Sequence, residues 1–459
     1  MDWLESGRVY SDFAARSPNP PMTPERLSVL HSWCRQSQWN SPTVVGGEGA
    51  WLLLEDGRRV LDMSSLSECS NLGHQHPAVV AAIRQQAAQL CFVTNAWGAR
   101  PRAELATRLL ELAGFEGGRV FFTTGGADAN EHAVKIVRQA LGKPRGTVIA
   151  RDRSYHGASY LAMALSGDAR SRAWVDPEAL GVTHVDPPDT YRCRFGSFDA
   201  DTCGELAAAA IGARIDELGT AQVAAVILEP NAGSNGIVAP DSYWPAVRRH
   251  TAERGVLLIA DEVMSAFGRC GEWFAWQRHG PSARPDVITL AKGLTGATLP
   301  LGAVILSAEV AARLDDQVLN TGLTYCGHPL ACAAGVAAIE AYVAENLIER
   351  SRVLGSVLKR ELDRVASRHP VIGDVRGGHG LFAVLELVAD RATREPLAPW
   401  PQTPPPLEAM LRAAMTQGVS FGSRGNLLLL APPLVIGESE LHQAIVMLDR
   451  LLTEFFPSP

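Results

Sequence analysis

Two short stretches decide the fold: residues 256–263 read VLLIADEV, and residues 286–293 read DVITLAKG. Each is a nearly uninterrupted apolar run of strand length that ends in a charged side chain. Such runs are typical of parallel strands buried on both faces of a sheet. The sequence therefore predicts two core strands, one ending in a carboxylate, Asp261, and the other in an amine, Lys292.

Similar runs surround these two strands. Helical patterns at 130–141 and 243–254 lie among further apolar runs at 120–123, 147–150, 223–228 and 303–306. Strands that alternate with helices favour an α/β fold, with a mainly parallel central sheet covered by helices on both faces.

The two ends of the chain predict a smaller domain. Residues 50–63 show the strand–turn–strand pattern of a hairpin, after an irregular arm over the first forty residues. From residue 329, two long helical stretches at 329–344 and 348–367 are followed by shorter strands around 381–387 and 426–430 and by a final helix near 438–455. A Pro-rich loop spans 399–406. We expect an arm and hairpin at 1–64 that belong to the small domain, a large α/β domain at 65–328 and a C-terminal α+β domain at 329–459.

Composition and charge disfavour several function classes. The 459 residues are 46% hydrophobic and 20% charged with a formal net charge of -7, which gives no support for nucleic-acid binding. The first ten residues lack the apolar core of a secretory signal, and no apolar run approaches the ~18 residues of a membrane span. We therefore expect a cytoplasmic protein that binds neither nucleic acid nor a membrane.

The cysteines carry no metal or redox signature. They form no CxxC pair and no zinc-type cluster with histidine, so no metal site is expected. Free thiols in a reducing cytosol are the simplest interpretation. The eight positions are Cys34, Cys69, Cys91, Cys193, Cys203, Cys270, Cys326 and Cys332.

Chemistry-bearing residues follow several predicted strands, where open α/β sheets bind ligands. The motif TTGGAD at 123–128 lies between a strand and a helix, so its backbone N–H groups could hold a phosphate; a plain βα turn is an equally good interpretation. Asp261 could pair with a protonated pyridine nitrogen or cap a helix. Lys292 could be a neutral, nucleophilic amine or a lysine that reaches solvent. Tyr155 could stack on a planar ring or pack in the core.

Together these motifs carry a resemblance. From about Thr43 to Leu452 the chain resembles the class III aminotransferases, pyridoxal-5′-phosphate (PLP) enzymes of fold type I. The most specific stretch, Asp261 to Gly302, contains DEVMSAFGR, GEWFAWQRHG, PDVITLAKGL and PLGAV. Further matches are GGADANE at 125–131, YHG at 155–157, Glu229-Pro230 and TYCGHP at 324–329. Within the class, GGADA, DEVM and Arg-x-Asn at 424–426 are most similar to the taurine–pyruvate-like branch.

The resemblance implies a role for each motif. Lys292 would hold PLP as a Schiff base and carry protons, and Asp261 would pair with the pyridinium nitrogen. Val263 would back one face of the ring, and Tyr155 would stack on the other with His156 beside it. The phosphate would bind at Gly125, Gly126 and Ala127.

The resemblance also implies partners. Thr324 would reach the phosphate in the neighbouring subunit, which implies a homodimer with shared active sites. Glu229 would lie near the phenolic oxygen of the cofactor or gate the substrate carboxylate, and Arg424 would bind the carboxylate of the acceptor. The reaction would move an amino group from an amine donor to a keto acid or aldehyde by a ping-pong mechanism.

Four positions differ from the family's common pattern. Glu68 stands where relatives have Trp or another apolar residue, although a solvent-facing carboxylate is the alternative interpretation. Asn231 stands in place of an apolar residue, Thr298 of an aromatic one, and Gly425 of the Trp found in the taurine–pyruvate-like branch. These changes predict a more polar pocket that binds a larger polar substrate through Glu68, Asn231 and Thr298. They also predict a specialised biosynthetic role.

Other functions stay open. The same cofactor could support decarboxylation, racemisation, elimination or replacement, or carbon–carbon bond formation. A catalytically silent relative could serve as a binding module, which the intact Lys292 and Asp261 disfavour. A nucleotide site at Gly125-Gly126 is weaker still, because the motif lacks Walker or Rossmann spacing.

Overall fold

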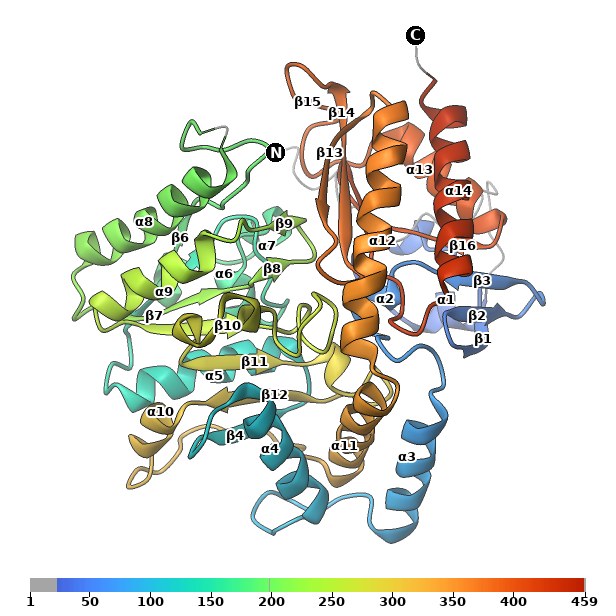
Figure 1. The fold of residues 1–459 in the computed structure, drawn as a ribbon. Helices are drawn as coiled ribbons and strands as arrows, with labels where there is room; N and C mark the ends of the chain where they lie inside the picture. Colours follow the sequence, from blue (N-terminus) through green and yellow to red (C-terminus); the bar gives the residue numbers. More distant parts are fainter. Residues whose placement is uncertain (1–22, 198, 458–459) are drawn as a thin grey trace. The chain divides into compact units, whose positions relative to one another are not determined.

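The computed structural model describes residues 23–197 and 199–457 and divides into two compact units. Unit 1 extends to Glu68 and includes Gly73–Gln75 and the chain from Arg352 onward, whereas unit 2 comprises Cys69–Leu72 and His76–Ser351. Figure 1 labels the elements of both units. Up to residue 22, the arm expected from the sequence lies outside the described residues.

Unit 2 is built on a seven-stranded sheet. The strands lie in the order β4 (Arg119–Thr123), β12 (Gly302–Leu306), β11 (Val287–Leu290), β10 (Leu257–Asp261), β7 (Val223–Leu228), β5 (Thr147–Arg151) and β6 (Val182–Val185). Only β12 runs antiparallel to its neighbours, β11 and β4. The predicted α/β class with a mainly parallel sheet is therefore confirmed, and β6 is a strand that the sequence patterns did not indicate.

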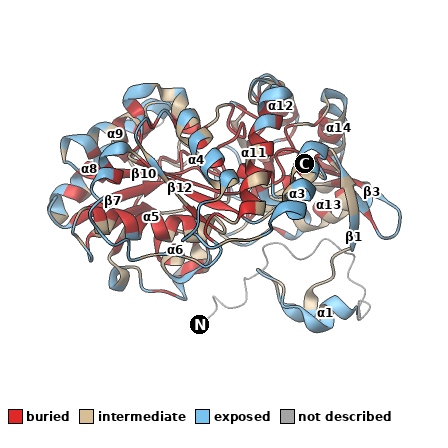
Figure 2. Cartoon of the chain, turned by 90° about the horizontal axis from the view of Figure 1, so that it is seen from below, coloured by how far each residue is buried: buried red, intermediate tan, exposed pale blue. Residues whose placement is uncertain are grey.

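Helices cover this sheet on both faces. α5 (Gly126–Ala140) packs against β11 and β12, α9 (Tyr243–Glu253) packs against β10, and α8 (Ala200–Leu218) lies beside α9. All residues of β7, β10, β11 and β12 are buried, and Figure 2 shows the labelled strands β7, β10 and β12 in red. Burial on both faces explains why their sequences are continuous apolar runs without polar alternation.

A cluster of three helices completes the larger part of unit 2. α11 (Pro329–Ala344) packs against α3 (Pro77–Gln89) and α4 (Arg100–Ala113). Residues 329–351, which we expected in the C-terminal domain, therefore group with unit 2. The shorter elements are α6 (Tyr160–Leu165), α7 (Ala169–Arg172), α10 (Ala308–Ala312), β8 (Asn231–Ala232), β9 (Ile237–Val238), η3 (Glu178–Leu180), η4 (Ala275–His279), η5 (Pro281–Ala283) and η6 (Lys292–Leu294).

Unit 1 contains two smaller sheets. The predicted hairpin, β2 (Trp51–Leu54) and β3 (Arg59–Asp62), pairs with β1 (Val44–Glu48) on one side and with β16 (Val419–Ser420) on the other. The parallel pairing of β16 with β3 joins the N-terminal and C-terminal segments in one unit. The second sheet is antiparallel and contains β13 (Ile372–Gly377), β14 (Ala383–Asp390), β18 (Leu427–Leu430) and β17 (Gly422–Arg424), with β15 (Glu395–Pro396) pairing to β14.

The predicted helices near the end of the chain are present and lie mostly within unit 1. α14 (Glu438–Phe455) has the predicted bounds, and α12 (Leu347–Arg368) extends the predicted helix by a residue at each end. α13 (Pro405–Thr416) begins inside the Pro-rich stretch, because proline is well tolerated in the first turn of a helix. Two further short helices, α1 (Pro24–Ser28) and η2 (Gln36–Gln38), lie in the N-terminal arm.

The cysteines depart from the expectation at one pair. Cys193, in the loop after β6, and Cys203, near the start of α8, form a disulfide with their Cα atoms 6.3 Å apart. The expectation of free thiols is therefore wrong for this pair, because the loop returns to the first turn of α8. The six other cysteines carry thiol groups.

No described helix is by itself long and apolar enough to cross a membrane. α11 and α12 satisfy the length and composition only as a pair, and they are bent by 61° at the break between them. Within residues 23–197 and 199–457, no three His, Cys, Asp or Glu side chains gather as metal ligands would.

Candidate active site

One cavity of about 390 Å³ lies at the carboxyl ends of β4, β5, β7, β10 and β11 in unit 2. This volume is within the range of about 300–1,000 Å³ that small-molecule sites occupy. Among the side chains that line the cavity are those of Tyr155, His156, Glu229, Asp261, Val263 and Lys292. Parallel strands present their carboxyl ends at the same edge of the sheet, so residues far apart in the sequence meet here.

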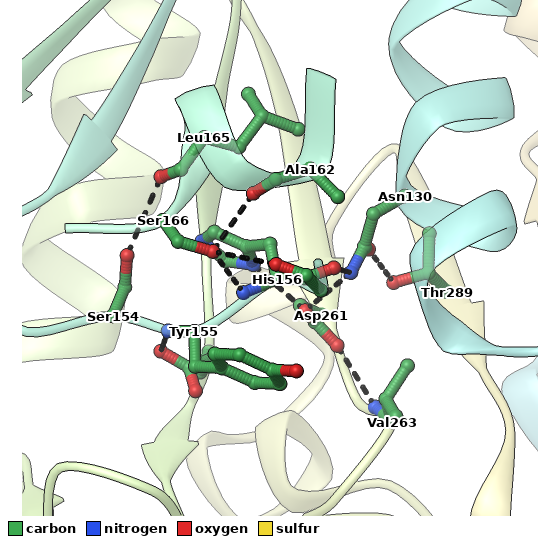
Figure 3. Close-up of polar contacts among 12 residues, drawn as sticks. Asn130, Ser154, Tyr155, His156, Ala162, Leu165, Ser166, Asp261, Val263 and Thr289 are labelled. Carbon is green, nitrogen blue, oxygen red and sulfur yellow. Dashed lines mark hydrogen bonds and ion pairs between the residues drawn. The ribbon is translucent and has the colours of Figure 1, made fainter. Parts of the chain in front are cut away.

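Asp261 ends β10, and its carboxylate is buried among hydrogen-bond donors. Oδ2 accepts a hydrogen bond from Nδ2 of Asn130 at 2.7 Å and lies 2.7 Å from Nδ1 of His156. Oδ1 accepts the backbone N–H of Val263 at 3.0 Å. Figure 3 shows these groups converging on Asp261. The Val263 contact is a local turn, but the other two come from distant segments, so Asp261 is more than a local cap.

Asn130 is a site residue that the sequence patterns did not single out. It lies on α5, is 1% exposed, and also donates from Nδ2 to the backbone carbonyl of His156 at 2.9 Å. Its Oδ1 accepts the hydroxyl of Thr289, on β11, at 2.6 Å. The amide therefore connects α5, β10 and β11 behind the cavity (Figure 3). The signal was a polar amide on the buried face of an amphipathic helix, because such a group requires partners.

Lys292 directly follows Ala291 at the end of β11 and begins η6. The lysine is partly buried, lines the cavity and has φ of +45°, which is uncommon for a residue other than glycine. The chain after it is tightly held: the hydroxyl of Tyr342 donates to the carbonyl of Gly293 at 2.8 Å, and a Cβ on Gly293 would lie 2.7 Å from Nδ2 of Asn71. A strained backbone persists where the surrounding packing fixes it, often at a functional site.

The start of α5 offers an anion site. Gly125 precedes the helix, and Gly126 begins it and lines the cavity with Ala127. An anion bound there would meet the first turn of the helix, whose N–H groups have no acceptor within the helix. A Cβ on Gly126 would lie 2.9 Å from Cγ1 of Val263, and a Cβ on Gly157 would lie 2.5 Å from that of Ala127. The two glycines therefore allow Val263 and the loop after β5 to pack against the helix start.

Glu229 follows β7 and is 5% exposed. Its Oε2 lies 3.4 Å from Nη2 of the fully buried Arg151 and accepts the backbone N–H of Tyr155 at 3.3 Å. Burial raises the pKa of Glu229 to about 7, although the neighbouring side chains of His156 and Arg151 act in the opposite direction. The cavity therefore contains a carboxyl group that changes protonation near neutral pH.

Tyr155 presents an aromatic ring to the cavity. The guanidinium of Arg170 lies over this ring, 5.1 Å from its centroid. Nε and Nη2 of Arg170 donate to the carboxylate of Asp168 at 3.0 and 2.9 Å, so the cation is itself held in place. Cation–π contact of this kind fixes an aromatic ring more firmly than apolar packing alone.

Besides Gly125, three predicted residues of unit 2 do not line this cavity. Thr298 donates its hydroxyl to the carbonyl of Thr295 at 2.7 Å. Asn231 makes a side-chain hydrogen bond with the thiol of Cys270. Thr324 is exposed in the loop before α11.

The other two predicted substrate residues belong to unit 1. Glu68 ends α2 (Ser65–Glu68), whose residues all have positive φ, and its side chain is 5% exposed. Its burial excludes the alternative of a solvent-facing carboxylate. Arg424 ends β17 and is 1% exposed, with its guanidinium 5.9 Å from the centroid of the Trp400 ring.

The lining of the cavity fits PLP. A helix N-terminus packed through Gly126 suits a phosphate, and the hydrogen-bonded carboxylate of Asp261 suits a pyridinium nitrogen. Tyr155 and Val263 offer flat and apolar surfaces for a ring, and Lys292 offers an amine for an aldehyde. No group in this set requires a metal.

Comparisons with known proteins agree with this geometry. Residues 35–452 match the family described as aminotransferase class-III. A putrescine–pyruvate aminotransferase of Pseudomonas aeruginosa is 32% identical over 90% of each chain, and a leucine/methionine racemase of Thermococcus litoralis is 34% identical over 94% of this chain and 95% of its own. The structure of taurine:2-oxoglutarate aminotransferase from Bifidobacterium kashiwanohense, in complex with PLP and glutamate, superposes with a TM-score of 0.88 at 35% identity, covering 94% of this chain and 96% of its own. The chain belongs to the class III aminotransferase family and is a PLP-dependent enzyme of fold type I.

Proposed function

We propose that this aminotransferase moves an amino group from a polar amine or amino acid to a keto acid or aldehyde in two half-reactions, with ping-pong kinetics. The observation that carries the proposal is that Lys292 and Asp261, from the adjacent strands β11 and β10, line one cavity. When bound, PLP supplies a ring that absorbs the electron pair left on the substrate carbon.

The residues of the cavity divide the work. Lys292 would hold the aldehyde of PLP through its amine, and once the amino group of the donor has displaced it, the freed amine would take a proton from the substrate carbon and give it back. Asp261 places a negative charge against the pyridinium nitrogen, and Asn130 and His156 keep that carboxylate in one orientation. Tyr155 and Val263 hold the two faces of the ring, and the start of α5 binds the phosphate through Gly125, Gly126 and Ala127.

Glu229 and Arg424 contribute to substrate binding. Glu229 lies at the phenolic side of the cofactor or gates the substrate carboxylate, and its pKa of about 7 allows it to act as either a neutral or a charged group. Arg424 binds the carboxylate of the keto acid acceptor, because a guanidinium pairs with a carboxylate through two parallel hydrogen bonds.

The active unit is a homodimer in which Thr324 reaches the phosphate of the partner's cofactor. Thr324 is exposed in this chain, and apolar side chains are exposed nearby: Trp97 is 70% exposed and Tyr325 57%. Arg102 connects their segments, because it donates to the carbonyls of Trp97 and Gly327 at 2.9 Å. A connected apolar surface of this kind is typical of an interface.

A polar substrate larger than taurine is the finer part of the proposal. Glu68 does not line the cavity, so its part in substrate binding rests on the sequence alone. Asn231 and Thr298 give it no support from this cavity, since neither lines it. Pyridoxamine phosphate formation would be measured with taurine and β-alanine against putrescine and larger polar amines; fast turnover of taurine or β-alanine would end this part of the proposal.

Racemisation is the second candidate reaction. The similarity to a racemase, at an identity comparable to that of the aminotransferases, favours considering it. Mass spectrometry of the cofactor after incubation with an amino donor, with and without pyruvate, separates the two. Accumulation of pyridoxamine phosphate without pyruvate indicates transamination, whereas inversion of the amino acid with no pyridoxamine form indicates racemisation.

Borohydride reduction tests the cofactor site itself. The reduced holoenzyme should carry the cofactor on the peptide that contains Lys292, and Lys292→Ala should abolish the labelling. Labelling of another side chain, or of none, would overturn the assignment of the site.

A further inference from the structure

A loop of unit 1 places an aromatic ring on Arg424. Trp400 lies in the loop between β15 and α13, and the guanidinium of Arg424 lies over its ring, 5.9 Å from the centroid. Arg424 is 1% exposed, so this contact is made away from solvent. A desolvated cation–π contact is stronger than an exposed one.

The loop is fixed to the hairpin that carries Arg424. Oδ1 of Asn426 accepts the backbone N–H of Ala398 at 2.8 Å, and its Nδ2 donates to the carbonyl of the same residue at 2.7 Å. A turn follows, in which the N–H of Gln402 donates to the carbonyl of Pro399 at 2.8 Å. Asn426 is 3% exposed, so these hydrogen bonds are protected from water. Trp400 therefore has a defined position relative to Arg424.

Gly425 makes room for the ring. It lies in the turn between β17 and β18 with φ of +55°, a conformation that favours glycine. A Cβ at this position would lie 2.8 Å from Cε3 and Cζ3 of Trp400. The backbone conformation and the space occupied by Trp400 thus both require glycine between Arg424 and Asn426.

We propose that Trp400 is a specificity-determining residue that orients Arg424 for acceptors bearing a carboxylate. A guanidinium that lies against an aromatic ring by its face still donates hydrogen bonds through its edge, in the plane where a carboxylate binds. The ring also replaces water over the cation, which strengthens the attraction to the carboxylate. Trp400 also restricts the orientations that the guanidinium can adopt before the carboxylate binds. This inference rests on the proposed role of Arg424 as the carboxylate-binding residue.

The test compares pyruvate with propanal, which lacks the carboxylate, as acceptors for the holoenzyme at saturating donor. Trp400→Leu should raise KM for pyruvate about five- to thirtyfold, corresponding to about 1–2 kcal/mol for a desolvated cation–π contact. The kcat for pyruvate and both constants for propanal should stay within about twofold of the parent. The KM for pyruvate of Trp400→Phe, which keeps an aromatic face, should lie between those of the parent and of Trp400→Leu. The inhibition constant of propionate, an unreactive carboxylate, should rise in parallel with KM for pyruvate.

Trp51→Leu is the matched control. Trp51 also lies in unit 1 and also carries an arginine over its ring, with Arg59 5.0 Å from the centroid, but it has no contact with the Arg424 hairpin among the contacts described. The KM of Trp51→Leu for pyruvate should equal that of the parent. Equal increases for pyruvate and propanal in Trp400→Leu, or no increase, would overturn the proposal, with Trp400→Phe deciding where Trp400→Leu does not fold.

Arg424→Gln tests the role of Arg424 separately from that of Trp400. If it raises KM for pyruvate while Trp400→Leu does not, the role of Trp400 is overturned and that of Arg424 stands. If Arg424→Gln leaves KM for pyruvate unchanged, Arg424 does not bind the carboxylate, and the inference for Trp400 is overturned with it.

Discussion

Nδ1 of His156 lies 2.7 Å from Oδ2 of Asp261, inside a site where both side chains are buried. The same oxygen accepts the amide of Asn130, so groups from the loop after β5 and from α5 meet on a carboxylate that belongs to β10. Second contacts of this kind fix the orientation of a functional group and tune its charge.

Asp261→Asn should lower kcat/KM by about 10²–10³-fold, the range expected when one member of a buried charged pair loses its charge. The amide oxygen of asparagine can still accept the hydrogen bonds of Asn130 and His156. The amide is neutral, however, so it presents no negative charge to the cavity. Steady-state kinetics with saturating PLP would measure the loss. The exposed Asp56→Asn, in the hairpin turn, is the control and should keep full activity.

Gly126→Ala should weaken PLP binding by about 5- to 150-fold, because a Cβ there would lie 2.9 Å from Val263 and overpacking of this kind costs about 1–3 kcal/mol. Gly125→Ala is the matched comparison. Its Cβ would meet no protein atom closer than 3.6 Å, and its φ of -173° is extended backbone that any residue adopts. Equilibrium titration of the apoenzyme with PLP should show the larger effect at Gly126; equal effects would contradict the packing argument.

Most of the sheet and the ends of its strands could be predicted from the sequence. The reason is that β7, β10 and β11 are buried on both faces, so their sequences are continuous apolar runs. β6 was missed because its four residues, VTHV, include two polar side chains and are only partly buried. Asp261 and Lys292 could be predicted for the same reason as their strands: each is a charge at the end of an apolar run.

The remaining features depend on contacts between distant segments. The position of Trp400 next to Gly425 joins residues that no local pattern connects. The grouping of residues 329–351 with unit 2 depends on the packing of α11 against α3 and α4. The alanine-rich sequence of α11 does not indicate which helices it packs against. Asn231 shows the opposite case: an unusual residue type was noticed, but its partner is Cys270 and not the cavity.

Glu229→Gln should change the pH dependence of stability. The pKa of Glu229 is about 7 in the folded protein against an ordinary value of 4.5, so the folded protein holds this proton more tightly than the unfolded chain does. Stability contributed by the protonated carboxyl is therefore complete below about pH 4.5 and is lost as the pH rises to about 7. The variant, which cannot ionise, should gain stability relative to the parent over that interval by about 3 kcal/mol.

Urea unfolding of the two apoenzymes between pH 5 and 8 would measure this gain. The attraction between Arg151 and the ionised carboxylate is already contained in the pKa of Glu229, and effects of the substitution that do not depend on pH cancel, so the change in the difference with pH is the test. Glu262, whose pKa burial also raises to about 7, is present in both proteins and cancels. A difference that stays constant from pH 5 to 8 would show that Glu229 ionises at its ordinary pKa.

Thr324→Ala should weaken PLP binding about 10- to 150-fold, the cost of about 1.5–3 kcal/mol for losing a hydrogen bond to a charged phosphate. Because Thr324 does not line the cavity of its own chain, the loss should arise in the partner's site. Mixed dimers test this directly. When Lys292→Ala and Thr324→Ala chains are combined, the Thr324→Ala chain keeps Lys292 and receives an intact Thr324 from its partner, so one site in each mixed dimer should bind PLP with the parent affinity. If Thr324 acted within its own chain, that site would stay weak and mixing would restore nothing. Homodimers of each variant, measured alone, give the baselines.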